Sequence, residues 1–165
     1  MTSTPRFALP FLSPGQAQKE FTHNEALQTL DIIAALAVEE APRIDPPESP
    51  ILGASYIIDA GATGDWTGMS QSVAAFTSGG WRFVAPLEGM AAYVKSTSTW
   101  ALYRAGAWEL GILRGSSVEV DGQQVVASRA AAIASATGGT TIDTEARGAI
   151  DEILAALRHH GLIET

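Results

Sequence analysis

The chain has 165 residues, 46% of them hydrophobic, with 18 acidic and 10 basic side chains and a net charge of −8. This composition excludes a wholly disordered chain, and the scattered Lys and Arg residues argue against nucleic acid as a partner. The absence of cysteine excludes disulfides and thiol catalysis. No segment is apolar for long enough to span a membrane or to act as a signal peptide, so we expect no membrane insertion and synthesis in the cytoplasm.

The first segment, residues 1–45, is predicted to be an arm followed by a helix. Pro5, Pro10 and Pro14 favour an extended arm, and Ser13 can cap a helix that begins with Pro14. The helix is predicted from residue 15 to about residue 40. Its apolar residues recur with helical period and are expected to form the packing face: Phe21, Leu27, Leu30, Ile33 and Leu36. Four prolines between residues 42 and 50 then predict an extended linker.

The middle segment, residues 46–127, contains an internal repeat. Pro50-Ile51-Leu52-Gly53, Tyr56-Ile57 and the run from Phe76 to Trp81 recur as Pro86-Leu87-Glu88-Gly89, Tyr93-Val94 and the run from Tyr103 to Trp108. Each copy combines an aromatic residue, a turn with glycine and a tryptophan. The repeat therefore predicts two similar antiparallel β units, each with its aromatic rings on neighbouring strands.

Strands are predicted at residues 55–59, 72–77, 81–85, 91–95, 100–104, 108–113, 118–120 and 123–126. The last two flank Asp121-Gly122, a strong hairpin signal because both turn residues must adopt positive φ. Residues 61–68 form a glycine-rich insertion that is absent from the second copy of the repeat. Such a loop is a candidate for a displayed contact surface.

The third segment, residues 128–165, is predicted to end in a helix of about eighteen residues, with Asp143 as N-cap and Gly161 just beyond its end. Ala146, Ile150, Ile153 and Leu157 have the four-three-four spacing of a coiled-coil seam, and Leu154 widens it. Isoleucine at both kinds of seam position favours three or more strands over two. Burial of so few side chains does not offset the entropy of ordering the helix, so it needs a partner, most simply copies of itself.

The sequence offers no convincing catalytic or metal centre. His159 and His160 are adjacent and point about 100° apart on a helix, so they cannot chelate one ion together. Asp59, Asp65 and Glu88 are a conceivable glycosidase set, but acids beside glycines are usually turn residues. We therefore expect no enzyme, no cofactor and no metal, with a glycan hydrolase as the least favoured alternative.

The four tryptophans allow a second hypothesis, a carbohydrate-binding module. Exposed indole rings stack on sugars. Trp81 and Trp108 are part of the repeat and are expected in the core. Trp66 in the insertion and Trp100 are less constrained, so they are the candidates for a ligand face.

Several stretches resemble an uncharacterised domain of alphaproteobacterial prophages and gene transfer agents. These are residues 9–20, the His23-Asn24-Glu25-Ala26-Leu27 run, residues 79–86 and Gly89. The closing segment, from Gly138 to Ile163, is similar to the end of many phage tail-fibre and head-fibre proteins. The resemblance implies a virion structural protein, a spike or fibre of a phage-like particle such as the head spike of a gene transfer agent, whose expected partners are capsid or other fibre proteins and host capsular polysaccharide.

Together these observations predict an α+β homotrimer with an N-terminal helix, a central antiparallel β module of two similar units, and a C-terminal helix that forms a trimeric bundle. The expected parts are residues 1–45 for particle docking or oligomerisation, 46–127 for the β module and 128–165 for oligomerisation. Particle docking is assigned to Phe7, Leu9, Pro10, Phe11 and Leu12, and trimerisation to Ala146, Ile150, Ile153, Leu154 and Leu157.

Overall fold

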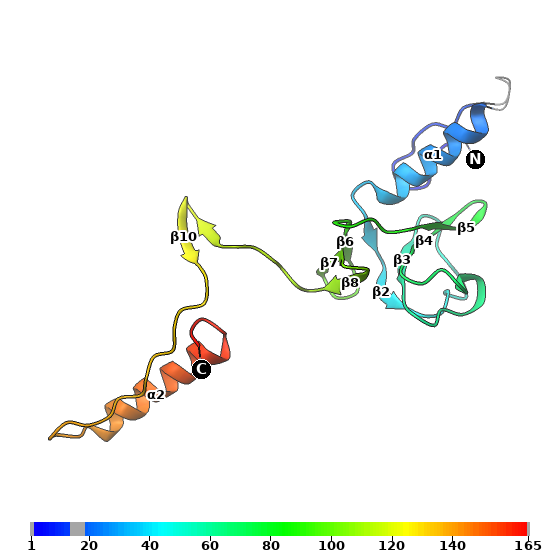
Figure 1. Ribbon diagram of the computed structural model, residues 1–165. Coiled ribbons are helices and arrows are strands. Elements are labelled where there is room, and N and C mark those ends of the chain that lie inside the picture. The colour runs from blue at the N-terminus through cyan, green and yellow to red at the C-terminus, as the bar shows by residue number, and fades with distance from the viewer. Residues whose placement is uncertain (1, 14–18, 165) are drawn as a thin grey trace. The chain divides into compact units, whose positions relative to one another are not determined.

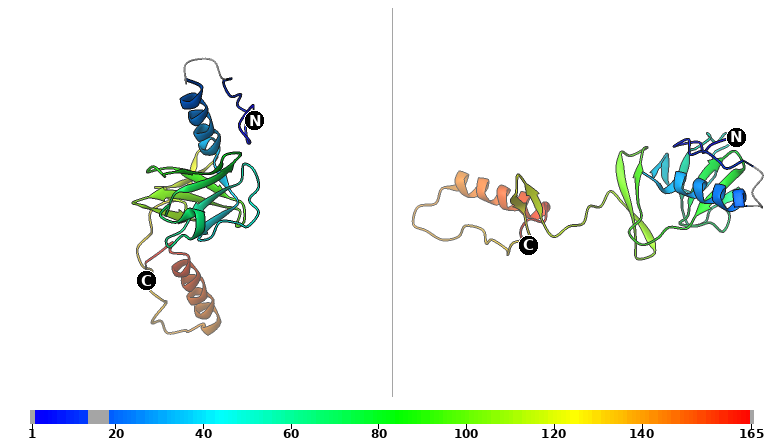
Figure 2. Two further views of the ribbon diagram at one scale, coloured as in Figure 1. Left: turned by 90° about the vertical axis from the view of Figure 1, so that its right-hand side faces the viewer. Right: turned by 90° about the horizontal axis from the view of Figure 1, so that it is seen from above.

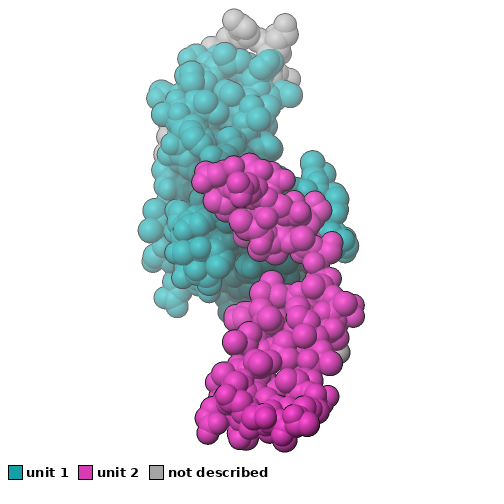
Figure 3. Space-filling view, turned by 90° about the vertical axis from the view of Figure 1, so that its left-hand side faces the viewer, with its two compact units in different colours: residues 1–112 teal, residues 113–165 magenta. Residues whose placement is uncertain are grey.

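The computed structural model describes residues 2–13 and 19–164, so the predicted helix start at Pro14 lies outside the described residues. The chain forms two compact units, residues 1–112 and 113–165, which Figure 3 colours separately. This division differs from the three predicted segments, because the N-terminal segment packs with the β module and the unit boundary falls at residue 112. The α+β class with two helices and mainly antiparallel sheets is confirmed. No helix among the described residues is long and apolar enough to cross a membrane.

The repeat is confirmed as two three-stranded antiparallel meanders (Figure 1). The first consists of β3 (Ser55–Ile58), β4 (Val73–Thr77) and β5 (Gly80–Val84), and the second of β6 (Ala91–Val94), β7 (Thr99–Arg104) and β8 (Ala107–Leu110). The equivalent aromatic pairs lie directly opposite each other across the last hairpin of each meander. Phe76 and Trp81 have ring centroids 5.1 Å apart, and Tyr103 and Trp108 have centroids 5.4 Å apart.

The turns that open the two meanders are also equivalent. Gly53 and Gly89 both have φ of +84°, which a glycine adopts without strain. The Gly53 amide donates to the Phe76 carbonyl, and the Gly89 amide donates to the Tyr103 carbonyl. Counted from these bonds, Tyr56 is level with Ala92. The predicted match of Tyr56 with Tyr93 is therefore wrong by one residue. Tyr93 is equivalent to Ile57, whose side chain lies on the other face of the first sheet from that of Tyr56.

The predicted helix of the first segment is too long. α1 (Lys19–Ile33) ends near Ala35, whose φ is +43°, and the chain continues as β1 (Ala37–Val38) and β2 (Glu40–Arg43). A left-handed alanine ends this helix where a glycine would normally signal the end, so the sequence carries no stop signal. Pro42 fits because β2 is an edge strand, where the missing N–H costs no ladder bond.

The segment with β1 and β2 connects the two sheets. β1 pairs in parallel with β6, and β2 pairs in parallel with β3, which gives the strand orders β1-β6-β7-β8 and β2-β3-β4-β5. The main core lies between the two sheets and under α1. Its buried members are Ile32, Leu36, Val38, Ala41, Ile57, Val73, Ala75, Ala92, Val94, Ala101 and Trp108.

The predicted packing face of α1 is wrong. Figures 1 and 2 show α1 rising from one end of the β module, so that only its C-terminal part reaches the sheets. Phe21 is 74% exposed and Leu30 is also exposed, whereas Ile32 and the carboxylate residue Asp31 are buried. Ile33 is also exposed and Leu27 is half-buried, so most of the predicted stripe lies outside the packing face. Of the five predicted residues only Leu36, which follows the end of α1, belongs to the main core.

The second unit holds a hairpin and the C-terminal helix. β9 (Val118–Val120) and β10 (Gln123–Val126) flank Asp121 and Gly122, both at positive φ, as predicted. α2 (Thr144–His159) begins at Asp143, whose carboxylate accepts from the Ala146 amide at 2.9 Å, and Gly161 follows its end at φ +69°. Among residues 113–164, only Leu154 and Ile163 are buried apolar residues.

Candidate interaction surfaces

Trp66 is a core residue and not a ligand contact, which corrects the prediction. The insertion forms the short 3-10 helix η1 (Gly64–Trp66), and the Trp66 side chain is 0% exposed. Its ring packs 5.6 Å from that of Tyr56 and 5.1 Å from that of Trp81. The insertion therefore covers the outer face of the first sheet and closes a second core, instead of displaying a loop for contact.

Trp100 is exposed on the outer face of the second sheet. It is 54% exposed and lies directly opposite Tyr93, which is half-buried. The two ring centroids are 5.6 Å apart at an interplanar angle of 69°. Alternation along the strands places Ala91 and Leu102 on the same face. We call Ala91, Tyr93, Trp100 and Leu102 the aromatic face.

The repeat explains why apolar side chains of the aromatic face are exposed. Its strand positions are equivalent to those of Ile57, Val73 and Ala75 in the first sheet, which are buried in the main core between the sheets. The second sheet uses its other face for that core. Beside the aromatic face, Arg104 and Glu109 approach to 3.5 Å and supply polar groups. Two rings with a charged pair beside them suit a ligand that offers both an apolar surface and hydroxyl groups.

The N-terminal arm folds back on α1, which corrects the predicted extended arm. Ser3 and Pro10 form a bridge, and the Thr4 amide donates to the Leu9 carbonyl at 2.9 Å. The Leu12 amide donates to the Asn24 side chain at 2.9 Å. Of the residues assigned to particle docking, Phe7, Pro10 and Leu12 are exposed, whereas Leu9 and Phe11 are half-buried.

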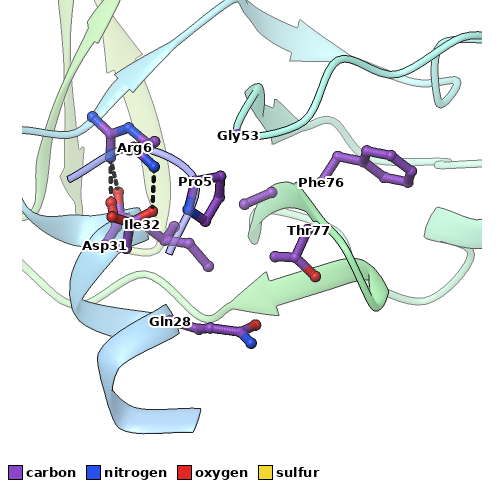
Figure 4. Close-up of a pocket in the computed structure, with 9 residues that line it drawn as sticks. Pro5, Arg6, Gln28, Asp31, Ile32, Gly53, Phe76 and Thr77 are labelled. Carbon is purple, nitrogen blue, oxygen red and sulfur yellow. Dashed lines mark hydrogen bonds between the residues drawn. The ribbon is translucent and has the colours of Figure 1, made fainter. Parts of the chain in front are cut away.

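Asp31 and Arg6 hold this arm in place (Figure 4). The buried Asp31 carboxylate accepts from the Thr4 hydroxyl at 2.7 Å and from the amides of Arg6 and Phe7 at 3.0 and 2.7 Å. The Arg6 guanidinium donates to the carbonyls of Asp31, Ile32 and Ala35 at 2.6 to 2.8 Å. A cation there satisfies the terminal carbonyls of the helix. Sequence reasoning missed Asp31 because it was placed outside the packing face.

The gap beneath the arm is too small for a ligand. Figure 4 shows Pro5 and Arg6 close to Gly53, with Gln28, Phe76 and Thr77 around them. The enclosed volume is about 10 Å³, roughly the space of one water molecule. The arm is therefore an integral part of the first unit.

The seam of α2 is uncovered within its own unit. Ile150 is 43% exposed and Ile153 is 59% exposed, Ala146 is exposed, and Leu157 is half-buried. Leu154 is buried at 4% exposure within a single chain, so it offers little surface to a partner. The stretch before α2 runs beside the helix, since the Arg158 guanidinium donates to the Ile133 carbonyl at 2.5 Å and Ala130 pairs with Ile163.

Two of the acidic residues considered for catalysis bind backbone amides in turns, and the third lies in a short helix. The Asp59 carboxylate accepts from the Ala60 amide at 2.7 Å, and the Glu88 carboxylate accepts from the Ala105 amide at 3.0 Å. Asp65 lies within η1. Within residues 2–13 and 19–164, no three His, Asp or Glu side chains are placed to hold a metal ion.

Comparison with known families gives one result. A family described as "Protein of unknown function (DUF2793)" matches residues 23–109, more than half of the chain. The match begins within α1 and ends within β8, so it covers most of the first unit, including both meanders. No curated protein matches the chain.

Proposed function

The chain belongs to the DUF2793 family of proteins of unknown function, and from this premise we propose that it is a structural protein of a phage-like particle, a head spike, fibre or fibre base, that assembles as a homotrimer. The exposed seam of α2 is the observation that carries the proposal. The particle context is supported by the resemblance of residues 9–20, 23–27, 79–86 and Gly89 to prophage and gene transfer agent domains. The virion is accordingly the proposed location.

The second unit has a small core. A unit of 53 residues with two buried apolar side chains among its described residues has too little core to be stable alone. Ile150 and Ile153 lie at seam spacing on α2 and are exposed, as are Val118, Val120 and Val125 of the hairpin. Packing the same seam from three copies would bury Ile150 and Ile153 without a further kind of partner, and isoleucine at the seam favours three strands.

The N-terminal arm is the proposed docking surface for the particle. Phe7 and Leu12 leave apolar surface exposed on a segment that Asp31 and Arg6 fix rigidly to α1. A rigid apolar surface docks at a lower entropy cost than a flexible arm. We propose that capsid or other fibre proteins bind there.

The mass of the purified full-length chain in solution tests the trimer. Light scattering is expected to give about three times the chain mass of 17.3 kDa. Ile153→Asp places a charge in the seam and is expected to reduce the mass to that of one chain. Glu152→Gln is the matched control, since Glu152 is exposed on the same helix and outside the seam. A wild-type protein of single-chain mass would refute the trimer.

A carbohydrate-binding module is the second candidate, and the exposed Trp100 beside Tyr93 favours it. Trp100 is placed to stack on a sugar ring, and Arg104 and Glu109 to bond its hydroxyls. Host capsular polysaccharide is expected to quench the tryptophan fluorescence of the wild-type chain. Trp100→Ala should abolish that response, and an equal response in this variant would remove the assignment.

A further inference from the structure

The sequence contains one Asp-Pro pair, Asp45-Pro46, in the connection between β2 and β3. In such a pair the side-chain carboxylate can act as a nucleophile on the main-chain carbonyl carbon of its own residue, because the ring that forms has five members. The nitrogen of proline is a good leaving group, since it departs as a basic secondary amine. Proline also lacks the N–H through which other residues attack a preceding Asp side chain. The chemistry of this pair therefore favours cleavage of the peptide bond.

The Arg43 guanidinium binds the carbonyl oxygen of this bond. Its Nε donates to the Asp45 carbonyl at 2.7 Å. Two contacts hold the guanidinium in place: its Nη1 lies 2.5 Å from Oε2 of Glu40, and its central carbon lies 5.5 Å from the centroid of the Tyr56 ring. Attack on the carbonyl carbon develops negative charge on the carbonyl oxygen. A cation fixed at that oxygen stabilises this charge, so Arg43 is placed to speed the attack.

The insertion of the first repeat copy holds the other two reacting groups. The Thr63 hydroxyl donates to Oδ1 of the Asp45 carboxylate, and the Thr63 amide donates to the Ile44 carbonyl at 3.1 Å. The Pro46 ring lies against Gly64, where a Cβ would be 3.2 Å from the ring Cγ. Fixing the carboxylate and the leaving group beside each other lowers the entropy cost of ring closure.

Solvent reaches these groups. Asp45 is exposed, and together with Arg43 and Asp59 it lines a groove of about 330 Å³. We propose that the chain cleaves its own Asp45–Pro46 bond by hydrolysis, with water as the co-reactant. Oδ2 of Asp45 forms a bond to the Asp45 carbonyl carbon, the electron pair of the broken C–N bond passes to the Pro46 nitrogen, and this nitrogen takes a proton from solvent. One water molecule then opens the cyclic anhydride, which restores the side-chain carboxylate and leaves a main-chain carboxylate on Asp45.

Cleavage divides the chain into residues 1–45 and 46–165 without separating the two parts. β1 and β2 pair with β6 and β3, so both sheets keep the first part bound. Four of its side chains are also buried in the main core: Ile32, Leu36, Val38 and Ala41. The product is a nicked first unit that retains its arm and α1. The reaction does not depend on the homotrimer or on the aromatic face, because every residue of the cleavage site lies elsewhere in the first unit.

The experiment follows the purified full-length chain over time at mildly acidic pH, by denaturing electrophoresis and intact mass. Two fragments are expected, whose masses add up to that of the chain and one water, and the larger should begin with Pro46. Asp45→Asn removes the nucleophile and is expected to stop cleavage. Arg43→Gln is expected to slow it at least about tenfold, because a donor to the developing oxyanion is lost. Arg104→Gln is the matched control, since Arg104 is also paired with a glutamate but lies in the second sheet.

The same chain unfolded in urea separates the effect of the site from the lability of any Asp-Pro bond. The folded chain is expected to cleave at least about tenfold faster, because only the fold places Arg43 and Thr63 at the bond. Thr63→Val leaves Arg43 and its ion pair intact, so it tests the site apart from any effect of Arg43 on folding, and it should also cleave more slowly than the wild type. The proposal is overturned if the wild type stays intact, if it cleaves no faster folded than in urea, or if either Arg43→Gln or Thr63→Val cleaves at the wild-type rate.

Discussion

The indole rings of Trp66 and Trp81 meet edge to face, with centroids 5.1 Å apart and planes at 83°. Trp81 belongs to the repeat and Trp66 to the insertion found in one copy only. Their contact makes the insertion part of the core of the first sheet, together with Tyr56 and Phe83. The first sheet thus has both faces covered, whereas the second keeps the aromatic face free.

Trp66→Ala is expected to destabilise the first unit strongly. Removing a large buried aromatic side chain costs about 3–5 kcal/mol, because both its transfer energy and the cavity count against the fold. Urea unfolding followed by circular dichroism measures the loss. Trp100→Ala is the matched control and should change stability little, since Trp100 is half-exposed. Equal losses in the two variants would contradict the assignment of Trp66 to the core.

Asp31→Asn is expected to loosen the arm. The carboxylate accepts three hydrogen bonds at 2.7, 2.7 and 3.0 Å, and the amide replaces one of its two acceptor oxygens with a donor. A hydrogen bond to a charged group contributes about 1.5–3 kcal/mol. Limited proteolysis should therefore cut residues 2–13 sooner in this variant than in the wild type. Asp65→Asn, an exposed carboxylate, serves as control. Unchanged protection of the arm would contradict the assignment of the Asp31 carboxylate as a residue that holds it.

The repeat predicts that Gly53→Ala and Gly89→Ala have matching costs. Both glycines have φ of +84°, so a side chain at either position strains the backbone by about 1–2 kcal/mol. A Cβ at residue 53 would lie no closer than 3.4 Å to Arg6 and Pro5, and one at residue 89 would meet open space. Neither position adds a clash. Thermal unfolding of the two variants should therefore show similar losses of stability. A much larger loss for Gly53→Ala would contradict this prediction and would mean that the arm leaves no room for a side chain at residue 53.

Much of the secondary structure was predictable from the sequence, because its signals come from residues close together in the chain. The hairpin at Asp121-Gly122, the Asp143 cap and the paired rings of Tyr103 and Trp108 all depend on residues close in sequence, and the structure confirms them. The predicted ends of the strands in both meanders agree with the structure within about one residue, the scatter usual for element ends, except that the last strand ends at Leu110 and not at residue 113.

The predictions were wrong where the burial or conformation of a residue depends on contacts with distant segments of the chain. Trp66 looked unconstrained because its partners, Tyr56 and Trp81, belong to β3 and β5. The burial of Trp66 depends on these tertiary contacts. The strands β1 and β2 were not predicted, because Pro42 argued for a linker and no glycine marks the end of α1. Buried Asp31 broke the apolar pattern of α1, because its role comes from hydrogen bonds to the arm and not from hydrophobic burial.

Tyr56 gives the fold a predictable response to alkaline pH. Burial raises the pKa of the Tyr56 phenol above its ordinary value of 10.0, and the nearby carboxylate of Glu39 raises it further. The folded state therefore holds this proton more tightly than the unfolded state. The resulting stability is complete below the unfolded pKa near 10 and is lost as the pH rises through the folded pKa. The wild-type free energy of unfolding should thus fall more steeply above about pH 10 than that of Tyr56→Phe, which has no phenol to ionise. Urea midpoints at about pH 8 and about pH 11 measure both slopes. Parallel slopes would mean that the phenolate is tolerated in the folded protein.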